Sequence, residues 1–206
     1  MSVIQELVPR QKKGSETGAT TKKRLSSRYA AKALFSDAKA RLLAINNWYA
    51  LCGNTGAEFR LTDEHGNFIH TAPEVGNLIR INLPAPPNAT GDGYDWVRIE
   101  KFDQQKELLT DEELFGFRVR PVSNPRNRVD DSAHFYTSDA TSTFLVYRKS
   151  LVVHAMERGR NEVPNPAGSI LNRIRNSIIA FFAMRGLAVP QWKKLVNGIL
   201  EPPDKN

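Results

Sequence analysis

Alternation of apolar and polar residues predicts a β-hairpin in the second half of this 206-residue chain. Residues 143–148 (TFLVYR) and 151–158 (LVVHAMER) are rich in the β-branched and aromatic side chains that suit a pleated surface. Lys149-Ser150 lies between them, so we expect residue 148 to face residue 151 across a two-residue turn. Both faces of the hairpin are largely apolar, which indicates a strand pair that is covered on both sides or lines a closed cavity.

Other segments show either the same alternation or the three-to-four-residue spacing of an amphipathic helix. The helical spacing predicts one helix over about 28–52 with Ser26 or Ser27 as its N-cap, a second over 167–185, and a short last helix from Pro190. Further strands are expected at six places: 58–62, 67–71, 76–83, 94–102, 116–122 and 133–137. The capping-box pattern of residues 110–113 (TDEE) predicts one helical turn.

This order of elements predicts an α+β protein with a curved, mostly antiparallel sheet of about 6–8 strands, packed against an N-terminal helix and a long C-terminal helix. The order resembles that of helix-grip ligand-binding domains, and the resemblance is in the order of elements alone. It implies an apolar cavity with a few polar groups at its mouth.

Residues 1–26 are expected to form a flexible basic arm ahead of a single α+β domain over 27–206. Residues 1–28 hold seven Lys and Arg against two Glu, whereas the whole chain has a net charge of +7, so the remainder is almost neutral. Nucleic-acid binding would have to use the arm through salt-sensitive phosphate contacts. A short basic tail is more often a solvated terminus, so we do not expect nucleic acid as a partner.

The single cysteine, Cys52, excludes an internal disulfide and a multi-thiolate metal site, and it fits a reducing compartment. No run approaches the roughly 18 apolar residues of a membrane span, and the N-terminus lacks the order of a secretion signal. We therefore expect a soluble, cytoplasmic protein with no cofactor and no bound metal. A site of two histidines and one carboxylate, from His134, His154 and Asp139, is the metal hypothesis that remains open.

Polar side chains gather where the second hairpin strand ends, around Gly159. Guanidinium groups match carboxylates and phosphates, so this segment is either an anion-binding rim or an internal Arg–Glu network. His154 is either a pocket histidine with a shifted pKa or a core histidine bonded to a backbone carbonyl. The predicted ligand-binding residues are His154, Arg158, Arg160, Asn161, Glu162, Tyr147, His134 and Trp96.

Three classes of function remain open. The first is a small-molecule-binding domain for a partly apolar ligand, with an anionic end gripped by Arg158, Arg160 and Asn161, and with a pocket lined by Leu145, Tyr147, His154 and Met156. The second is an enzyme of the hydrolase or cyclase type that uses His154 or Glu157 for acid–base chemistry, supported by His134 and Arg158. It requires these side chains on one face of the sheet. The third is a protein or nucleic-acid interaction module that uses the basic arm. A homodimer formed through an apolar sheet face is a further hypothesis.

Overall fold

The computed structural model describes residues 7–54, 56–82, 94–126, 139–163 and 188–203. Within these ranges, seven strands form one antiparallel sheet in the order β1-β7-β6-β5-β4-β3-β2. The strands are β1 (Ser15–Arg24), β2 (Glu58–Thr62), β3 (Leu78–Asn82), β4 (Asp95–Glu107), β5 (Glu112–Pro121), β6 (Thr141–Lys149) and β7 (Val152–Glu162). The predicted fold class is confirmed. The helix expected over 167–185 and the strand expected over 133–137 lie outside the described residues.

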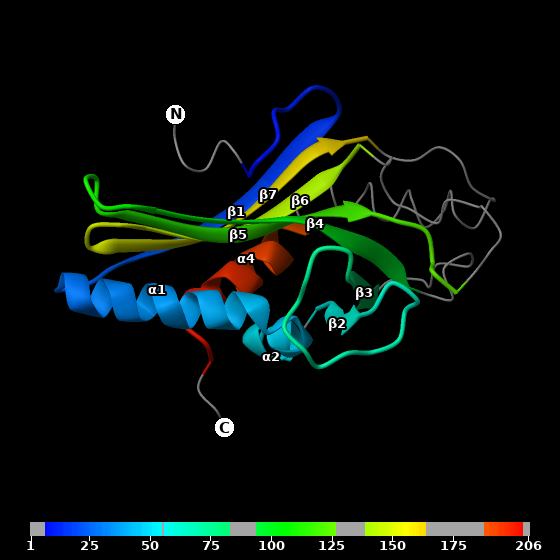
Figure 1. Ribbon diagram of the computed structural model, residues 1–206, viewed down its shortest axis with the longest axis horizontal. Helices are drawn as coiled ribbons and strands as arrows, with labels where there is room; N and C mark the ends of the chain where they lie inside the picture. The colour runs from blue at the N-terminus through cyan, green and yellow to red at the C-terminus, as the bar shows by residue number, and fades with distance from the viewer. Residues whose placement is uncertain (1–6, 55, 83–93, 127–138, 164–187, 204–206) are drawn as a thin grey trace.

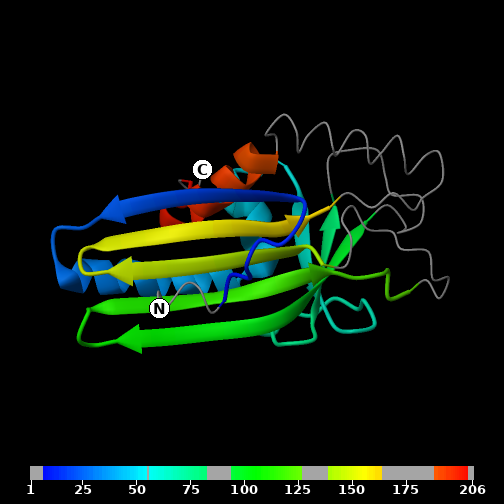
Figure 2. The same cartoon turned by 90° about the horizontal axis from the view of Figure 1, so that it is seen from above.

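The helices lie on one side of the curved sheet (Figure 1). They are α1 (Arg28–Leu43), the 3-10 turn η2 (Ile45–Asn47), α2 (Trp48–Leu51) and α4 (Ala188–Leu200). Viewed from above, α4 lies beneath the edge formed by β1 and β7, and α1 runs beneath the middle of the sheet (Figure 2). We call this side the helix face and the opposite side the outer face. Within the described residues, no helix is long and apolar enough to cross a bilayer.

The main hydrophobic core fills the helix face around Trp48. The Trp48 ring contacts Phe59 and Phe144 at centroid distances of 5.2 and 4.9 Å, and its indole N–H donates to the Leu42 carbonyl at 3.2 Å. Phe144 in turn meets Trp192 of α4 edge to face, at 5.4 Å. These contacts join α2, the sheet and α4 through large aromatic surfaces, which contribute most to burial in a core of this kind.

The helix predicted over 28–52 begins where expected but is broken near its end. Ser27 is the N-cap, because its side-chain oxygen accepts from the Ala30 amide at 3.1 Å. The helical path stops at Ala44, and η2 and α2 follow. Asn46 explains the position of η2, since its side chain accepts from the Leu61 amide and donates to the Ile69 carbonyl. The break lets one amide side chain bind β2 and the loop after it.

The hairpin of β6 and β7 has the predicted faces but a different register. Lys149 pairs with Val152, so the turn is Ser150-Leu151 rather than Lys149-Ser150. Ser150 has a φ of 51°, the left-handed conformation that a tight hairpin turn requires. The pairing is therefore shifted by two residues, and a shift of two preserves which side chains share a face.

The prediction of a flexible arm over 1–26 is wrong for Ser15–Arg24, which form strand β1. This strand pairs with β7 along its length, from Ser15–Glu162 to Arg24–Val152. Its Lys-, Gly- and Thr-rich sequence is typical of a sheet edge, where charged side chains discourage pairing with another chain. The prediction of a helical turn over 110–113 is also wrong. This segment closes the β4–β5 hairpin, and Asp111 there has a φ of 51°.

Candidate functional site

His154 and Tyr147 lie opposite each other on the outer face of the β6–β7 hairpin. Their rings are 5.8 Å apart, and Lys22 of β1 is the other cross-strand neighbour of His154. Burial and the nearby Lys22 ammonium lower the pKa of His154, so its neutral form is favoured. Burial and the neighbouring Glu112 carboxylate raise the pKa of Tyr147 to about 12. Neither group is therefore charged near neutral pH.

The two apolar residues expected to line a pocket with them are covered by the N-terminal segment. Leu145 and Met156 form a small cluster with Leu7 and Leu114 on the outer face. Leu7 is fully buried there, and its carbonyl accepts from Arg118. This part of the outer face is thus packed by the chain itself.

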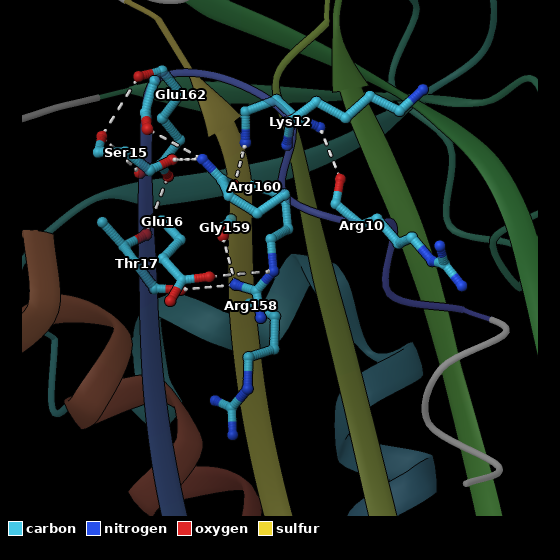
Figure 3. Close-up of polar contacts among 12 residues, drawn as sticks. Arg10, Lys12, Ser15, Glu16, Thr17, Arg158, Gly159, Arg160 and Glu162 are labelled. Carbon is cyan, nitrogen blue, oxygen red and sulfur yellow. Dashed lines mark hydrogen bonds and ion pairs between the residues drawn. The ribbon is translucent and has the colours of Figure 1, made fainter. Parts of the chain in front are cut away.

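The guanidinium groups of Arg158 and Arg160 are directed to β1, the neighbouring edge strand (Figure 3). Arg158 donates to the carbonyls of Ala19 and Glu157 at 3.1 and 2.8 Å and to the Thr20 hydroxyl at 2.8 Å. Arg160 donates to the Gly159 carbonyl at 2.7 Å and lies 3.6 Å from the Glu16 carboxylate. The contacts with Ala19, Thr20 and Glu16 are internal and join β7 to β1, and among them only the Arg160–Glu16 pair is between an arginine and a glutamate.

Asn161 connects the end of β7 to the segment that precedes β1. It adopts a φ of 57°, which asparagine tolerates better than most residues, at a bulge where β7 has an extra residue relative to β1. Its side-chain oxygen accepts from the backbone N–H of Lys12 at 2.7 Å, and its backbone N–H donates to the side-chain oxygen of Gln11 at 2.9 Å. Asn161 therefore orders the chain before β1.

Glu157 differs from these residues because its side chain enters the helix face. Its cross-strand neighbours are Phe144 on β6 and Ala19 on β1, both members of the main core. The side chain is fully buried, and neither carboxylate oxygen has a hydrogen-bond partner within the described residues. Burial, and then repulsion by the Glu162 carboxylate, raise the pKa of Glu157 to about 8. The neighbouring Ser142 hydroxyl lowers the pKa in part, although it does not reach hydrogen-bonding geometry.

Glu162 lies on the same side, where two hydroxyl groups of β1 hold it. One carboxylate oxygen accepts from Thr17 at 2.9 Å and the other from Ser15 at 3.5 Å (Figure 3). Burial raises the pKa of Glu162 as well. Gly159 makes room for this arrangement, because a Cβ at that position would collide with the Glu162 carboxylate and the Thr17 hydroxyl. Two buried carboxyl groups thus share the helix face of β7, one in the middle of the strand and one at its end.

Of the remaining predicted site residues, the one that the structure describes does not lie near Glu157 and Glu162. Trp96 is buried on β4, three strands away from β7 in the sheet. His134 lies outside the described residues. Asp139 precedes β6 and pairs with Lys13 at 2.5 Å, at the opposite end of β6 from the Tyr147–His154 pair. His154 and Asp139 therefore do not share a metal site.

The hypothesis of a His154–Glu157 acid–base pair is not supported. Side chains alternate along β7, with Val153, Ala155 and Glu157 on the helix face and His154 and Met156 on the outer face. The sheet itself separates the two groups. The helix-face cluster can do different chemistry. A largely protonated Glu157 can donate a hydrogen bond, and it can exchange a proton with a ligand that changes the pKa of its carboxyl group.

Sequence reasoning missed the part of this cluster that β1 supplies, namely Ser15 and Thr17. Their segment has the composition of a solvated arm, and Ala19 is its one buried hydrophobic residue. The sequence did indicate that Glu157 is unusual. It lies on the same face of the strand as the apolar residues Val153 and Ala155, where a carboxyl group is not expected.

No family model matches the chain, and no curated protein does. The chain is similar to the solved structure of norcoclaurine synthase from Thalictrum flavum at 11% identity and a TM-score of 0.40, covering 93% of this chain and 98% of that one. It is similar to Ara h 8.0201 at 6% identity and a TM-score of 0.37, with 90% and 99% covered. For major latex-like protein 151 from Panax ginseng the identity is 8%, the TM-score 0.33 and the coverage 84% and 98%.

Proposed function

We propose that the protein binds a small molecule on the helix face, between the ends of β1, β6 and β7, with Glu157 as the polar group that contacts the ligand. The observation that carries this proposal is a fully buried carboxyl group without a hydrogen-bond partner in the described part of the chain. Buried polar groups in proteins are nearly always hydrogen-bonded, so one that is not calls for an explanation. Strongly shifted carboxyl groups also gather at functional sites.

The surroundings of Glu157 define the chemistry of the ligand. Phe144 and Ala19 flank the carboxyl group, and Phe144 contacts Trp192, so the ligand is expected to be partly apolar. Because the pKa of Glu157 is about 8, the carboxyl group is mostly protonated at pH 7 and donates a hydrogen bond to a carbonyl or hydroxyl oxygen. Glu162 nearby disfavours an anionic end at this site, and the guanidinium groups of Arg158 and Arg160 are directed to β1 instead.

The proposal is tested with the full chain in two steps. Native mass spectrometry of the purified protein, with a denatured control, looks for an adduct present only in the native spectrum. Titration with 6-propionyl-2-dimethylaminonaphthalene, whose carbonyl accepts a hydrogen bond and whose emission shifts in apolar surroundings, then measures saturable binding in the wild type, in Glu157→Leu and in His154→Leu. We expect Glu157→Leu to weaken binding about tenfold, as the loss of one hydrogen bond to a buried group implies, and His154→Leu to leave it unchanged.

Two results would overturn the proposal. One is a bare native spectrum together with no saturable binding of the probe. The other is the reverse pattern, in which His154→Leu abolishes binding and Glu157→Leu does not, because this would put the ligand on the outer face. Circular dichroism of both variants verifies that each is folded before binding is measured.

The hypotheses of a homodimer and of nucleic-acid binding stay predictions. Lys22, Lys23 and Arg24 belong to β1 and not to a flexible arm. A nucleic acid would therefore have to contact an ordered edge strand, and its binding would weaken steeply with salt.

A further inference from the structure

The tip of the β4–β5 hairpin presents two consecutive leucines to solvent. Leu108 is 81% exposed and Leu109 is 100% exposed. Both stand on a turn between two strands, and the turn protrudes from one end of the molecule (Figure 1). Single apolar residues are common on protein surfaces, but apolar side chains grouped on one exposed feature indicate an interaction site.

A third exposed apolar residue lies at the same end. Tyr29, in the first turn of α1, is 85% exposed. Both views show the start of α1 and the β4–β5 tip at one end of the molecule (Figures 1 and 2). An ion pair between Arg28 and Asp111, with 3.3 Å between nitrogen and oxygen, joins the two elements directly. The exposed apolar side chains therefore come from two elements held together at this end.

The charged residues of this end are layered, with cations outside. Three ion pairs here have an exposed cation: Arg28–Asp111 at 3.3 Å, Lys106–Glu113 at 3.7 Å and Lys149–Glu112 at 2.7 Å. The buried Arg148 pairs with Asp111 and Glu113 from the inside. The three cationic side chains are 60–72% exposed, whereas the three carboxylates are only 13–23% exposed. Glu107 is exposed, but the three paired carboxylates near the leucines are less exposed than the cations that pair with them. The outermost charges of these three ion pairs are therefore positive.

A cleft of about 230 Å³ opens between the hairpin tip and the first turns of α1. Its lining includes four cationic side chains, from Arg28, Lys32, Lys106 and Arg148, and Leu108 lies beside them. The lining also includes Glu107, Asp111 and Glu112. Arg148 is buried and paired with Asp111 and Glu113, so the lining cations open to a ligand are Arg28, Lys32 and Lys106. Outward cations next to exposed apolar side chains match the two parts of a phospholipid, an anionic headgroup and its acyl chains.

We propose that this end of the molecule docks on a membrane surface that contains anionic phospholipids. Leu108, Leu109 and Tyr29 enter the interfacial layer, and the outward cations face the headgroups. A membrane fits better than a protein partner because the leucines stand on a convex tip, and a tip can enter a fluid interface without a preformed groove. Interfacial binding of this kind combines apolar burial with attraction to anionic lipid. The proposal is independent of the small-molecule site, whose carboxyl groups lie in the middle of β7 (Glu157) and at its far end (Glu162).

The test is cosedimentation of the full chain with vesicles of phosphatidylcholine alone and of phosphatidylcholine with phosphatidylserine. We expect binding to the anionic vesicles that weakens as salt rises, because the Debye length shortens. The double variant Leu108→Asn/Leu109→Asn is expected to lower vesicle partitioning at least tenfold, since each leucine loses its apolar burial. Both residues are solvent-exposed, so the fold is expected to be retained.

Matched controls distinguish binding at this site from non-specific adsorption to vesicles. Val75 is 61% exposed elsewhere on the molecule, so Val75→Asn should leave partitioning unchanged while Leu109→Asn reduces it. Lys106→Gln/Lys149→Gln should weaken binding to the anionic vesicles. The proposal is overturned if the wild type does not sediment with anionic vesicles, or if Leu108→Asn/Leu109→Asn sediments as well as the wild type. Binding of soluble glycerophosphoserine without vesicle binding would also overturn it.

Discussion

His154 and Glu157 lie three residues apart on β7, and their side chains point to opposite faces of the sheet. His154 faces Tyr147 on the outer face, whereas Glu157 enters the helix face between Phe144 and Ala19. The consequence is that each ionisable group is controlled by a different set of neighbours. Lys22 acts on His154, and Glu162 acts on Glu157.

Glu157 should make the protein less stable as the pH rises. Burial raises the pKa of its carboxyl group from 4.5 to about 8, so between these values the folded state keeps a proton that the unfolded state has released. The unfolded state binds fewer protons there, and the free energy of unfolding therefore falls with increasing pH, by roughly 3–5 kcal/mol across the interval. Urea unfolding of the full chain at pH 5, 7 and 9 measures this loss.

The variant Glu157→Gln is the control, because its amide does not titrate. The difference between wild type and variant isolates Glu157. His154, whose pKa lies below 6.5, adds stability with rising pH only in the acidic range, and it does so in both proteins. Parallel stability curves for wild type and variant between pH 5 and 9 would contradict a protonated Glu157.

Gly159→Ala should destabilise the protein by about 1–2 kcal/mol, because the added methyl group displaces the hydrogen bond between Thr17 and Glu162. Elsewhere in a strand, replacement of glycine by alanine is neutral or stabilising, so the sign itself is informative. Chemical denaturation measures the change. In a Thr17→Ala background the same substitution should cost less, and an equal cost in both backgrounds would show that this contact is not responsible.

Arg148 and Lys149 are neighbours on β6, and their ion pairs should contribute very differently to the free energy of unfolding. Arg148 is buried and donates to Glu113 at 2.8 Å, Asp111 at 2.7 Å and the Ser150 carbonyl at 2.8 Å. Arg148→Met removes the buried partner of two carboxylates, which keep only their pairs with the exposed Arg28 and Lys106, and it should cost about 3–5 kcal/mol. Lys149→Met removes an exposed pair with Glu112 and should cost less than about 1 kcal/mol. Equal losses in thermal unfolding would refute this distinction.

Leu7→Ala should destabilise the protein by about 2–5 kcal/mol, since Leu7 is fully buried against Leu114, Leu145 and Met156. The same substitution at Leu109, which is completely exposed, should change stability by less than about 0.5 kcal/mol. Urea midpoints of the two variants make the comparison. A negligible effect at Leu7 would mean that the N-terminal segment does not hold the outer face in solution.

Local patterns predicted the elements whose signal is repeated within a few residues. The β6–β7 hairpin has the expected faces although its turn lies one residue later, because alternation specifies the face and turn geometry specifies the pairing. Ser26 or Ser27 was predicted as the cap from its place before an amphipathic run, and Ser27 is the residue that caps α1. Strand β1 was not predicted, because an edge strand with one buried hydrophobic residue, Ala19, has almost no local pattern to recognise.

The sequence by itself determined the α+β class, the antiparallel sheet and the concentration of polar groups at the end of β7, since these follow from periodicity and composition over short windows. Only the tertiary structure decided what those polar groups do. The pairing of β1 with β7 turns Arg158 and Arg160 into internal contacts, and the helices bury Glu157 on the other face. The physical reason is that a charge or hydrogen-bonding group acquires its pKa and its partners from neighbours in space. For Glu157 and Glu162 those neighbours include β1, more than 130 residues away in the chain.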